Sequence, residues 1–250
     1  MAKVEGGKGL AVDPLHQFEI QPILSIHVGG LNLSFTNSAL WMAIAAVAAV
    51  LLLTLATRNR ALVPGRMQNI AEMLYEMIAN MLRDNVGPEG RRYFPFIFTL
   101  FIFILFGNLL GMLPGSFTFT SHLVVTFAMA AVIFIAVTVI GIALHGAHFL
   151  RLFFPEGAPL WTAVILVPVE LVSYLSRPVS LSVRLFANMM VGHTLLKVMG
   201  GFVVMLGFAG ILPLALLVGI TALEFLVAVL QAYVFTILTC IYLHDAIHLH

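Results

Sequence analysis

The sequence predicts an all-α integral membrane protein, for three reasons. Hydrophobic residues make up 61% of its 250 residues and charged residues only 9%, against about 25% charged residues in soluble domains. The mean hydropathy is +1.07. Apolar runs near the roughly 20 residues needed to cross a bilayer recur along the chain. We therefore expect one membrane domain, 1–250, with upright transmembrane helices, an amphipathic surface helix and two long C-terminal apolar segments.

The composition excludes several classes of protein. A formal net charge of +1 argues against a nucleic-acid partner. The single cysteine, Cys240, excludes an internal disulfide framework and a multi-thiolate metal site. The start of the chain lacks the apolar core of a signal peptide and the Arg- and Ser-rich pattern of a transit peptide. We expect 1–38 to remain on the mature chain as a tail before the first span.

Three apolar runs predict transmembrane helices. The first covers 39–57 and is followed by Arg58, the second covers 94–113, and the third covers 122–145. At 1.5 Å per residue, each comes close to the length that crosses a hydrocarbon core of about 30 Å. These runs are the upright helices of the expected fold.

Between the first two spans, 66–85 has the periodicity of an amphipathic helix. Its charged residues fall away from the apolar positions, which recur at helical spacing: Ile70, Leu74, Met77, Ile78 and Met81. This pattern favours a helix that lies on a membrane surface or on a partner. A short soluble hairpin that packs on itself is the alternative.

The basic residues predict the orientation in the membrane. Arg151 follows the third span, and six arginines lie between the first and second spans: Arg58, Arg60, Arg66, Arg83, Arg91 and Arg92. Loops rich in Lys and Arg stay in the cytoplasm. We therefore expect a periplasmic N-terminus and a cytoplasmic C-terminus.

The last third of the chain contains two apolar segments, 161–206 and 211–243, that are too long for simple spans. The stretch from Glu170 to Gly207 alone would be about 56 Å long if helical, nearly twice the thickness of the hydrocarbon core. Such a helix either breaks near its glycines or crosses the membrane at a steep tilt.

Ionisable side chains inside these segments are candidates for function, because each is costly in the membrane unless it faces protein or water. They are Glu170, Arg177, Arg184, His193, Lys197 and Glu224. The first three are seven residues apart, so on a helix they form one slowly drifting stripe together with Ser173, Ser180 and Asn188.

An antiparallel hairpin of the two segments would bring polar residues to equal depth. Residues at equal depth share a sequence midpoint, which should fall in the turn signal from Gly207 to Pro213. Three pairs meet this condition: Arg184 with Gln231, His193 with Glu224, and Glu170 with Asp245. Because polar positions are numerous, chance coincidence is the alternative.

In this register Arg184 divides two polar tracks. One track leads towards the cytoplasm and consists of Glu170, Ser173, Ser176 and Ser180; the other leads to the opposite face and consists of Asn188, His193, Glu224 and Gln231. Carboxyl, imidazole, hydroxyl and amide groups suit a water-assisted proton path. A permanently charged guanidinium cannot relay a proton, so Arg184 is expected to be a barrier.

These residues resemble a known family. The stretch SRPVSLSVRLFANMMVGH at 176–193 and the stretch ALEFLVAVLQAYVFTILTCIYLHDA at 222–246 are similar to the proton-channel subunit a of bacterial F-type ATP synthases, as are DPLHQFEI and FGNLLGMLPG. The resemblance implies that Arg184 faces a ring of proteolipid c subunits bearing carboxylates, with Asn188 and Gln231 nearby. It also implies that the two long segments are steeply tilted helices.

The resemblance further implies a function and a set of partners. Protons would pass through two offset half-channels to and from the rotating c-ring, coupling proton flow to ATP synthesis, in a non-catalytic subunit without a cofactor. Peripheral-stalk b-type subunits, the catalytic head and the lipid bilayer would be partners in the cell inner membrane. Some members carry an acid at the position of His193 and a histidine at that of Glu224, so the order of this pair is variable.

A proton-coupled secondary transporter is the alternative function. Such transporters show internal repeats with matched discontinuous helices, and no second copy of the Arg184 segment is visible. The C-terminal His244 and His248 are spaced like a metal pair, but terminal histidines are usually solvated, and we expect no metal site.

Overall fold

The computed structural model describes residues 19–24, 27–28, 31–32, 34–58, 64–113, 115–146, 149 and 163–248. Its main elements are six helices, and the ranges are α1 Asn37–Arg58, α2 Arg66–Val86, α3 Phe94–Gly111, α4 Leu123–His145, α5 Ala163–Met205 and α6 Ile211–Ile247. Short 3-10 helices occur at η2 Pro88–Tyr93, η3 Phe119–Ser121 and η6 Gly207–Gly210. Residues 1–18 of the predicted tail, Arg60 and Arg151 lie outside the described residues.

Five helical segments within the described residues are long and apolar enough to cross a membrane, and α2 is not among them. The all-α membrane prediction is therefore confirmed. The predicted spans agree with α1, α3 and α4 to within two residues at each end. The long C-terminal segments correspond to α5 and α6, of which α6 runs four residues further than predicted.

Two short antiparallel strand pairs precede α1, and the sequence analysis did not predict them. β1 (Pro22–Leu24) pairs with β4 (Phe35–Thr36), and β2 (His27–Val28) pairs with β3 (Leu31–Asn32). Strands of two or three residues are too short to display a two-residue period in the sequence. Asn37 joins them to α1, because its side-chain oxygen accepts hydrogen bonds from the backbone of Gln21 and Ser38.

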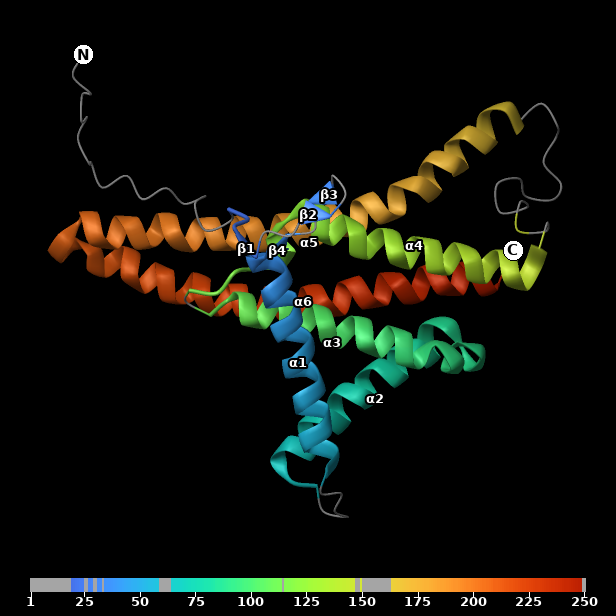
Figure 1. Cartoon of the computed structure of the whole chain (residues 1–250), viewed down its shortest axis with the longest axis horizontal. Helices are drawn as coiled ribbons and strands as arrows, with labels where there is room; N and C mark the ends of the chain where they lie inside the picture. The colour runs from blue at the N-terminus through green and yellow to red at the C-terminus, as the bar shows by residue number, and fades with distance from the viewer. Residues whose placement is uncertain are drawn as a thin grey trace.

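The two long helices form an antiparallel hairpin, which Figure 1 shows lying along the longest dimension of the molecule. The 43 residues of α5 continue through Gly192, Gly200 and Gly201 without a break. At 1.5 Å per residue, the 37 residues of α6 extend for about 55 Å. Of the two alternatives for a helix too long to cross the membrane upright, a break at the glycines is therefore wrong.

The first part of α5, golden in Figure 1, diverges from the rest of the hairpin. This helix contains Pro168 and Pro178. Proline lacks the amide hydrogen and crowds the preceding turn, and is a usual cause of helix bending. At the opposite end η6 closes the hairpin: Gly207 has φ +56°, and a Cβ on Gly210 would lie 2.5 Å from the Val203 carbonyl oxygen. The turn therefore requires glycine at both positions.

The other helices pack around the hairpin. α3 packs along α6, α4 contacts both α5 and α6, and α1 crosses α3 at a steep angle in Figure 1. The core contains the fully buried Phe101, Leu185 and Phe235. Two polar contacts fix the packing, since the Asn108 amide donates to the Ala228 carbonyl at 3.1 Å and the Thr138 and Tyr174 hydroxyls lie 2.7 Å apart.

The helix α2 lies where the amphipathic segment 66–85 was expected, and it is one continuous helix rather than a hairpin that packs on itself. It contacts α1, α3 and α6, and its buried positions are Ala71, Ile78, Met81, Leu82 and Val86. Of the apolar positions predicted for its inner face, Ile78 and Met81 are buried, while Ile70 is exposed. The partner of its apolar face is thus this chain itself.

Candidate functional site

Arg184 lies on the outer side of α5, and its side chain is exposed. Apolar neighbours on this side are exposed as well, among them Val183, Val191 and Leu195. Within the described part of the chain, the guanidinium has neither a hydrogen bond nor an ion pair. A permanent charge on an apolar surface needs a partner of opposite charge or water, so this position suits contact with a carboxylate outside the chain.

One turn further along α5, Asn188 donates a hydrogen bond to the Gln231 side chain of α6. Asn188 is exposed, whereas Gln231 is buried. The site holds this contact in place through α3, because Asn108 bonds the Ala228 carbonyl just before Gln231. Gln231 therefore contacts Asn188, one helical turn from the Arg184 with which the sequence analysis paired it.

His193 and Glu224 form the second contact of the hairpin. The Nε2 atom of His193 lies 3.7 Å from Oε1 of Glu224, and their side chains are 11% and 4% exposed. Gly192 makes this approach possible, since a Cβ at that position would lie 2.7 Å from the same carboxyl oxygen. Neither oxygen of Glu224 has a hydrogen-bond partner among the described residues, so His193 is its charge partner there.

Thr118, which the sequence analysis missed, completes this site. Its hydroxyl donates to the Gly111 carbonyl at 2.9 Å and lies 3.1 Å from Nε2 of His193. Because the single hydroxyl proton is used at Gly111, the oxygen is free to accept a hydrogen bond from the His193 ring. The arrangement favours a proton on Nε2, directed between Thr118 and Glu224. No sequence signal pointed to Thr118, because it lies between α3 and α4, 75 residues before His193 in the sequence.

The segment around η3 is held against α3 by close packing. Gly107 and Gly111 leave room for it, since a Cβ there would lie 2.4 Å from the Phe119 ring and 2.7 Å from the Thr118 side chain. His122 stacks on Phe117 with ring centroids 5.0 Å apart. Burial lowers the pKa of His122, so its ring is neutral near pH 7.

The predicted pairing of Glu170 with Asp245 is not what the structure has. Asp245 lies 3.0 Å from Arg177, whose guanidinium also stands over the rings of Tyr174 and Tyr242. Arg177 is therefore neutralised at the interface of α5 and α6. Glu170 is half-buried and lies between Pro168 and Pro178, near the start of α5. The bend moves it away from the straight path that the midpoint rule assumed.

Two of the three serines proposed for the cytoplasmic track, Ser176 and Ser180, lie on the outer side of α5. Ser176 and Ser180 are exposed, and the Ser176 hydroxyl donates to the Ser173 carbonyl at 2.7 Å. They share this side with Arg184, at spacings of four residues. The hydroxyl groups thus form a polar row that ends at the guanidinium.

The described residues contain no group of three or more His, Cys, Asp or Glu side chains that could hold a metal ion. His244 and His248 stack with centroids 4.7 Å apart, and Cys240 is buried. In its described part the site is therefore built from three polar contacts, Asn188 with Gln231, His193 with Glu224 and His193 with Thr118, and one exposed guanidinium.

Comparison with known proteins gives a consistent result. Residues 39–244 match the family ATP synthase A chain. ATP synthase subunit a of Paramagnetospirillum magneticum is 64% identical over 245 residues, covering 95% of this chain and 99% of the relative. Subunit a of Rhodospirillum rubrum is 62% identical, with coverage of 95% and 99%, and that of Parvibaculum lavamentivorans is 57% identical, with coverage of 97% and 96%.

The family match includes every helix that carries the site, and the similarity to these relatives extends over nearly the full length of each. The chain belongs to the ATP synthase A chain family.

Proposed function

We propose that Arg184 separates two proton half-channels that lead to and from the rotating c-ring of an F-type ATP synthase. The chain translocates protons in the membrane sector of this complex, as its family does, and is not itself catalytic. The observation that carries the residue assignment is the exposed Arg184 on an apolar helix surface, beside the Asn188–Gln231 contact. A transporter is not favoured by the family match.

On the uptake side, a proton passes His193, Glu224 and Asn188 before it reaches a ring carboxylate. The 3.7 Å separation of His193 and Glu224 allows a proton to be exchanged through a small movement or one bridging water. Gln231 keeps Asn188 beside the path. A ring carboxylate that gains the proton becomes neutral and can enter the lipid phase.

On the release side, Arg184 meets the protonated ring carboxyl after nearly a full turn of the ring. Its fixed positive charge favours the ionised carboxylate, so the proton is released rather than carried past. The released proton leaves along Ser180, Ser176 and Glu170. The same charge repels protons and prevents direct leakage between the two half-channels.

The chain is a multi-pass inner-membrane protein. The arginines in and near α2 include Arg58, Arg66 and Arg83. They support an orientation in which the connection between α1 and α3 and the C-terminus lie in the cytoplasm and the N-terminus lies in the periplasm. Partners in the complex are the proteolipid c-ring and peripheral-stalk b-type subunits, and the catalytic head acts through them. The length of α6 supports a steeply tilted hairpin beside the ring.

Affinity purification from native membranes tests the proposed complex. A tagged chain is expected to come out with a proteolipid ring and an ATPase head, and the preparation should pump protons on addition of ATP after reconstitution. A tagged copy of an unrelated multi-pass protein is the control. Recovery of the chain alone, with substrate-coupled proton uptake, would favour the transporter.

Thr118→Val is expected to slow ATP-driven proton pumping by about 2- to 10-fold, the effect of losing one neutral hydrogen bond of His193. Ser116 still donates to the Gly111 carbonyl at 2.7 Å, so α3 keeps that contact. Thr118→Ser retains the hydroxyl and should restore pumping. Pumping is measured in inverted vesicles at matched levels of complex. Near-normal pumping by the valine variant together with a loss in the serine variant would show that only packing matters at this position.

A further inference from the structure

A cavity of about 600 Å³ lies between the second half of α2, η2 and the first turn of α3. Its polar lining consists of Asn80, Arg83 and Arg91, and its aromatic lining of Tyr75 and Phe94. Among the described residues no acidic side chain lines it. The cavity therefore carries two positive charges without a lining counter-charge.

The two guanidinium groups have donors available. Arg83 donates to the Asn80 side chain at 2.9 Å, and its Nε lies 3.8 Å from Asp84 in a pair whose side chains are 72% and 70% exposed. Such exposed pairs contribute little. No acidic partner of Arg91 occurs within the described ranges. Guanidinium groups bind phosphate oxygens through paired N–H donors, so the lining suits a phosphate group.

The remaining wall of the cavity is apolar and lies where a membrane span begins. The rings of Tyr75 and Phe94 are 4.7 Å apart at their centroids, and Phe94 stacks on Phe98 at 5.4 Å. Phe94 is the first residue of the apolar α3, while α2 exposes Met73 and Tyr75. The cavity thus lies at the level where lipid headgroups meet the hydrocarbon.

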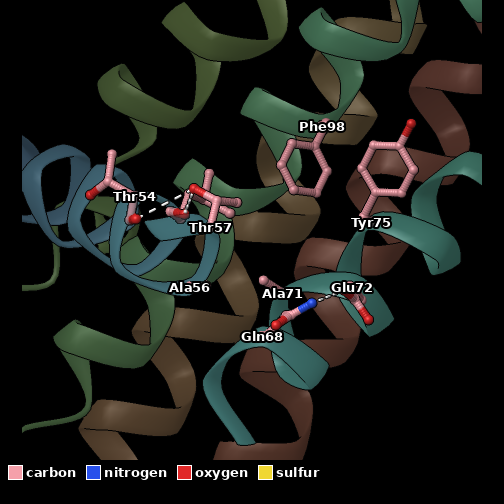
Figure 2. Close-up of a pocket in the computed structure, with 9 residues that line it drawn as sticks. Thr54, Ala56, Thr57, Gln68, Ala71, Glu72, Tyr75 and Phe98 are labelled. Atoms are coloured by element: carbon pink, nitrogen blue, oxygen red, sulfur yellow. Dashed lines mark hydrogen bonds between the residues drawn. The ribbon is translucent and has the colours of Figure 1, made fainter. Parts of the chain in front are cut away.

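A second cavity of about 440 Å³ adjoins Tyr75, between α1, α2 and α3. Figure 2 shows its lining, with the rings of Tyr75 and Phe98 side by side, Ala71 below them, and the polar pair Gln68 and Glu72, joined by a 2.7 Å hydrogen bond, at the lower edge. The Thr54 and Thr57 hydroxyls there already donate to carbonyls of their own helix at 2.8 Å. This cavity offers a mainly apolar surface beside the cationic one, which a free phosphate ion would not use.

We propose that the cavity between Arg83 and Arg91 binds the phosphate of an anionic phospholipid, with an acyl chain running along Tyr75 and Phe98. The guanidinium groups hold the phosphate. The described lining of the cavity that contains them has no acidic residue, which disfavours a headgroup that ends in an ammonium there; Glu72 lines only the adjoining cavity and is bonded to Gln68. This site is independent of the proton path. It anchors α2 to the cytoplasmic leaflet beside the hairpin.

Photolabelling of the purified, assembled complex tests the proposal. Phosphatidylglycerol and phosphatidylcholine probes, each with a diazirine near the glycerol end of one acyl chain, are added in nanodiscs, and labelled peptides are mapped. Arg83→Gln with Arg91→Gln is expected to weaken phosphatidylglycerol labelling of the Tyr75 and Phe98 peptides by about 30-fold. Arg66→Gln with Arg92→Gln removes the same charge from the loop outside the cavity and should leave labelling unchanged.

Several outcomes would overturn the site. Equal labelling of these peptides by both probes in the wild-type complex would remove the headgroup selectivity, and this comparison needs no variant. Loss of labelling on addition of millimolar inorganic phosphate would identify a free-anion site. An equal loss of phosphatidylglycerol labelling in both double variants would show that the total positive charge of this region, and not the cavity, attracts the lipid. A lack of labelling in the wild-type complex would mean that another subunit covers the cavity.

Discussion

Arg184→Lys is expected to slow ATP-driven proton pumping severely while the complex remains assembled. Lysine keeps a positive charge, but it replaces a planar fork of donors by a compact ammonium that can lose its proton on burial. The lysine can then carry a proton across the barrier, and it binds a ring carboxylate less well. Loss of a charge-assisted hydrogen bond costs about 1.5–3 kcal/mol, so we expect a decrease of roughly 10- to 100-fold.

Inverted vesicles report the effect as the quenching of a pH-sensitive dye after addition of ATP. Arg177→Lys is a matched control, because it makes the same chemical change one heptad away, where the guanidinium pairs with Asp245 inside the hairpin. That variant should keep most of its pumping. Near-normal pumping by a stably assembled Arg184→Lys complex would remove this arginine from the centre of the mechanism.

Hydrophobic runs were enough to predict the helices, because burial in lipid leaves a signal of nearly twenty residues for each span. The hairpin register near the turn was also predictable. The predicted pair His193 with Glu224 is in contact, whereas Gln231 contacts Asn188 and not the predicted Arg184; the sequence midpoints of the two contacts are 208.5 and 209.5. Near a tight turn, two antiparallel helices have had little length over which to diverge.

The register far from the turn was not predictable. The midpoint moves to 211 for Arg177 with Asp245, because equal rise along two straight, parallel axes no longer holds after a long distance and a bend. Thr118 was missed for a different reason. It reaches His193 through tertiary packing of η3 on Gly107 and Gly111, and no periodicity in the sequence records such a contact.

Exchanging His193 and Glu224 is expected to recover pumping that each single change impairs. A buried imidazole and carboxyl at 3.7 Å titrate as a pair, so the proton belongs to both. His193→Glu alone places two acids together, and Glu224→His alone places two bases together. Breaking a buried pair costs about 3–5 kcal/mol, and we expect each single variant to pump at less than about a tenth of the wild-type rate.

The double variant His193→Glu with Glu224→His restores one acid and one base at the same two positions. Gly192 still leaves room at position 224, and Thr118 can donate its hydroxyl to an acid at position 193 because Ser116 also bonds the Gly111 carbonyl. Pumping and complex content are measured for all four versions. A matched control, His193→Gln with Glu224→Gln, keeps polar side chains but removes both titrating groups, so it should stay as slow as the single variants. If the exchanged pair is no faster than this control at equal assembly, or if both single variants pump normally, these two residues do not form a shared proton-uptake site.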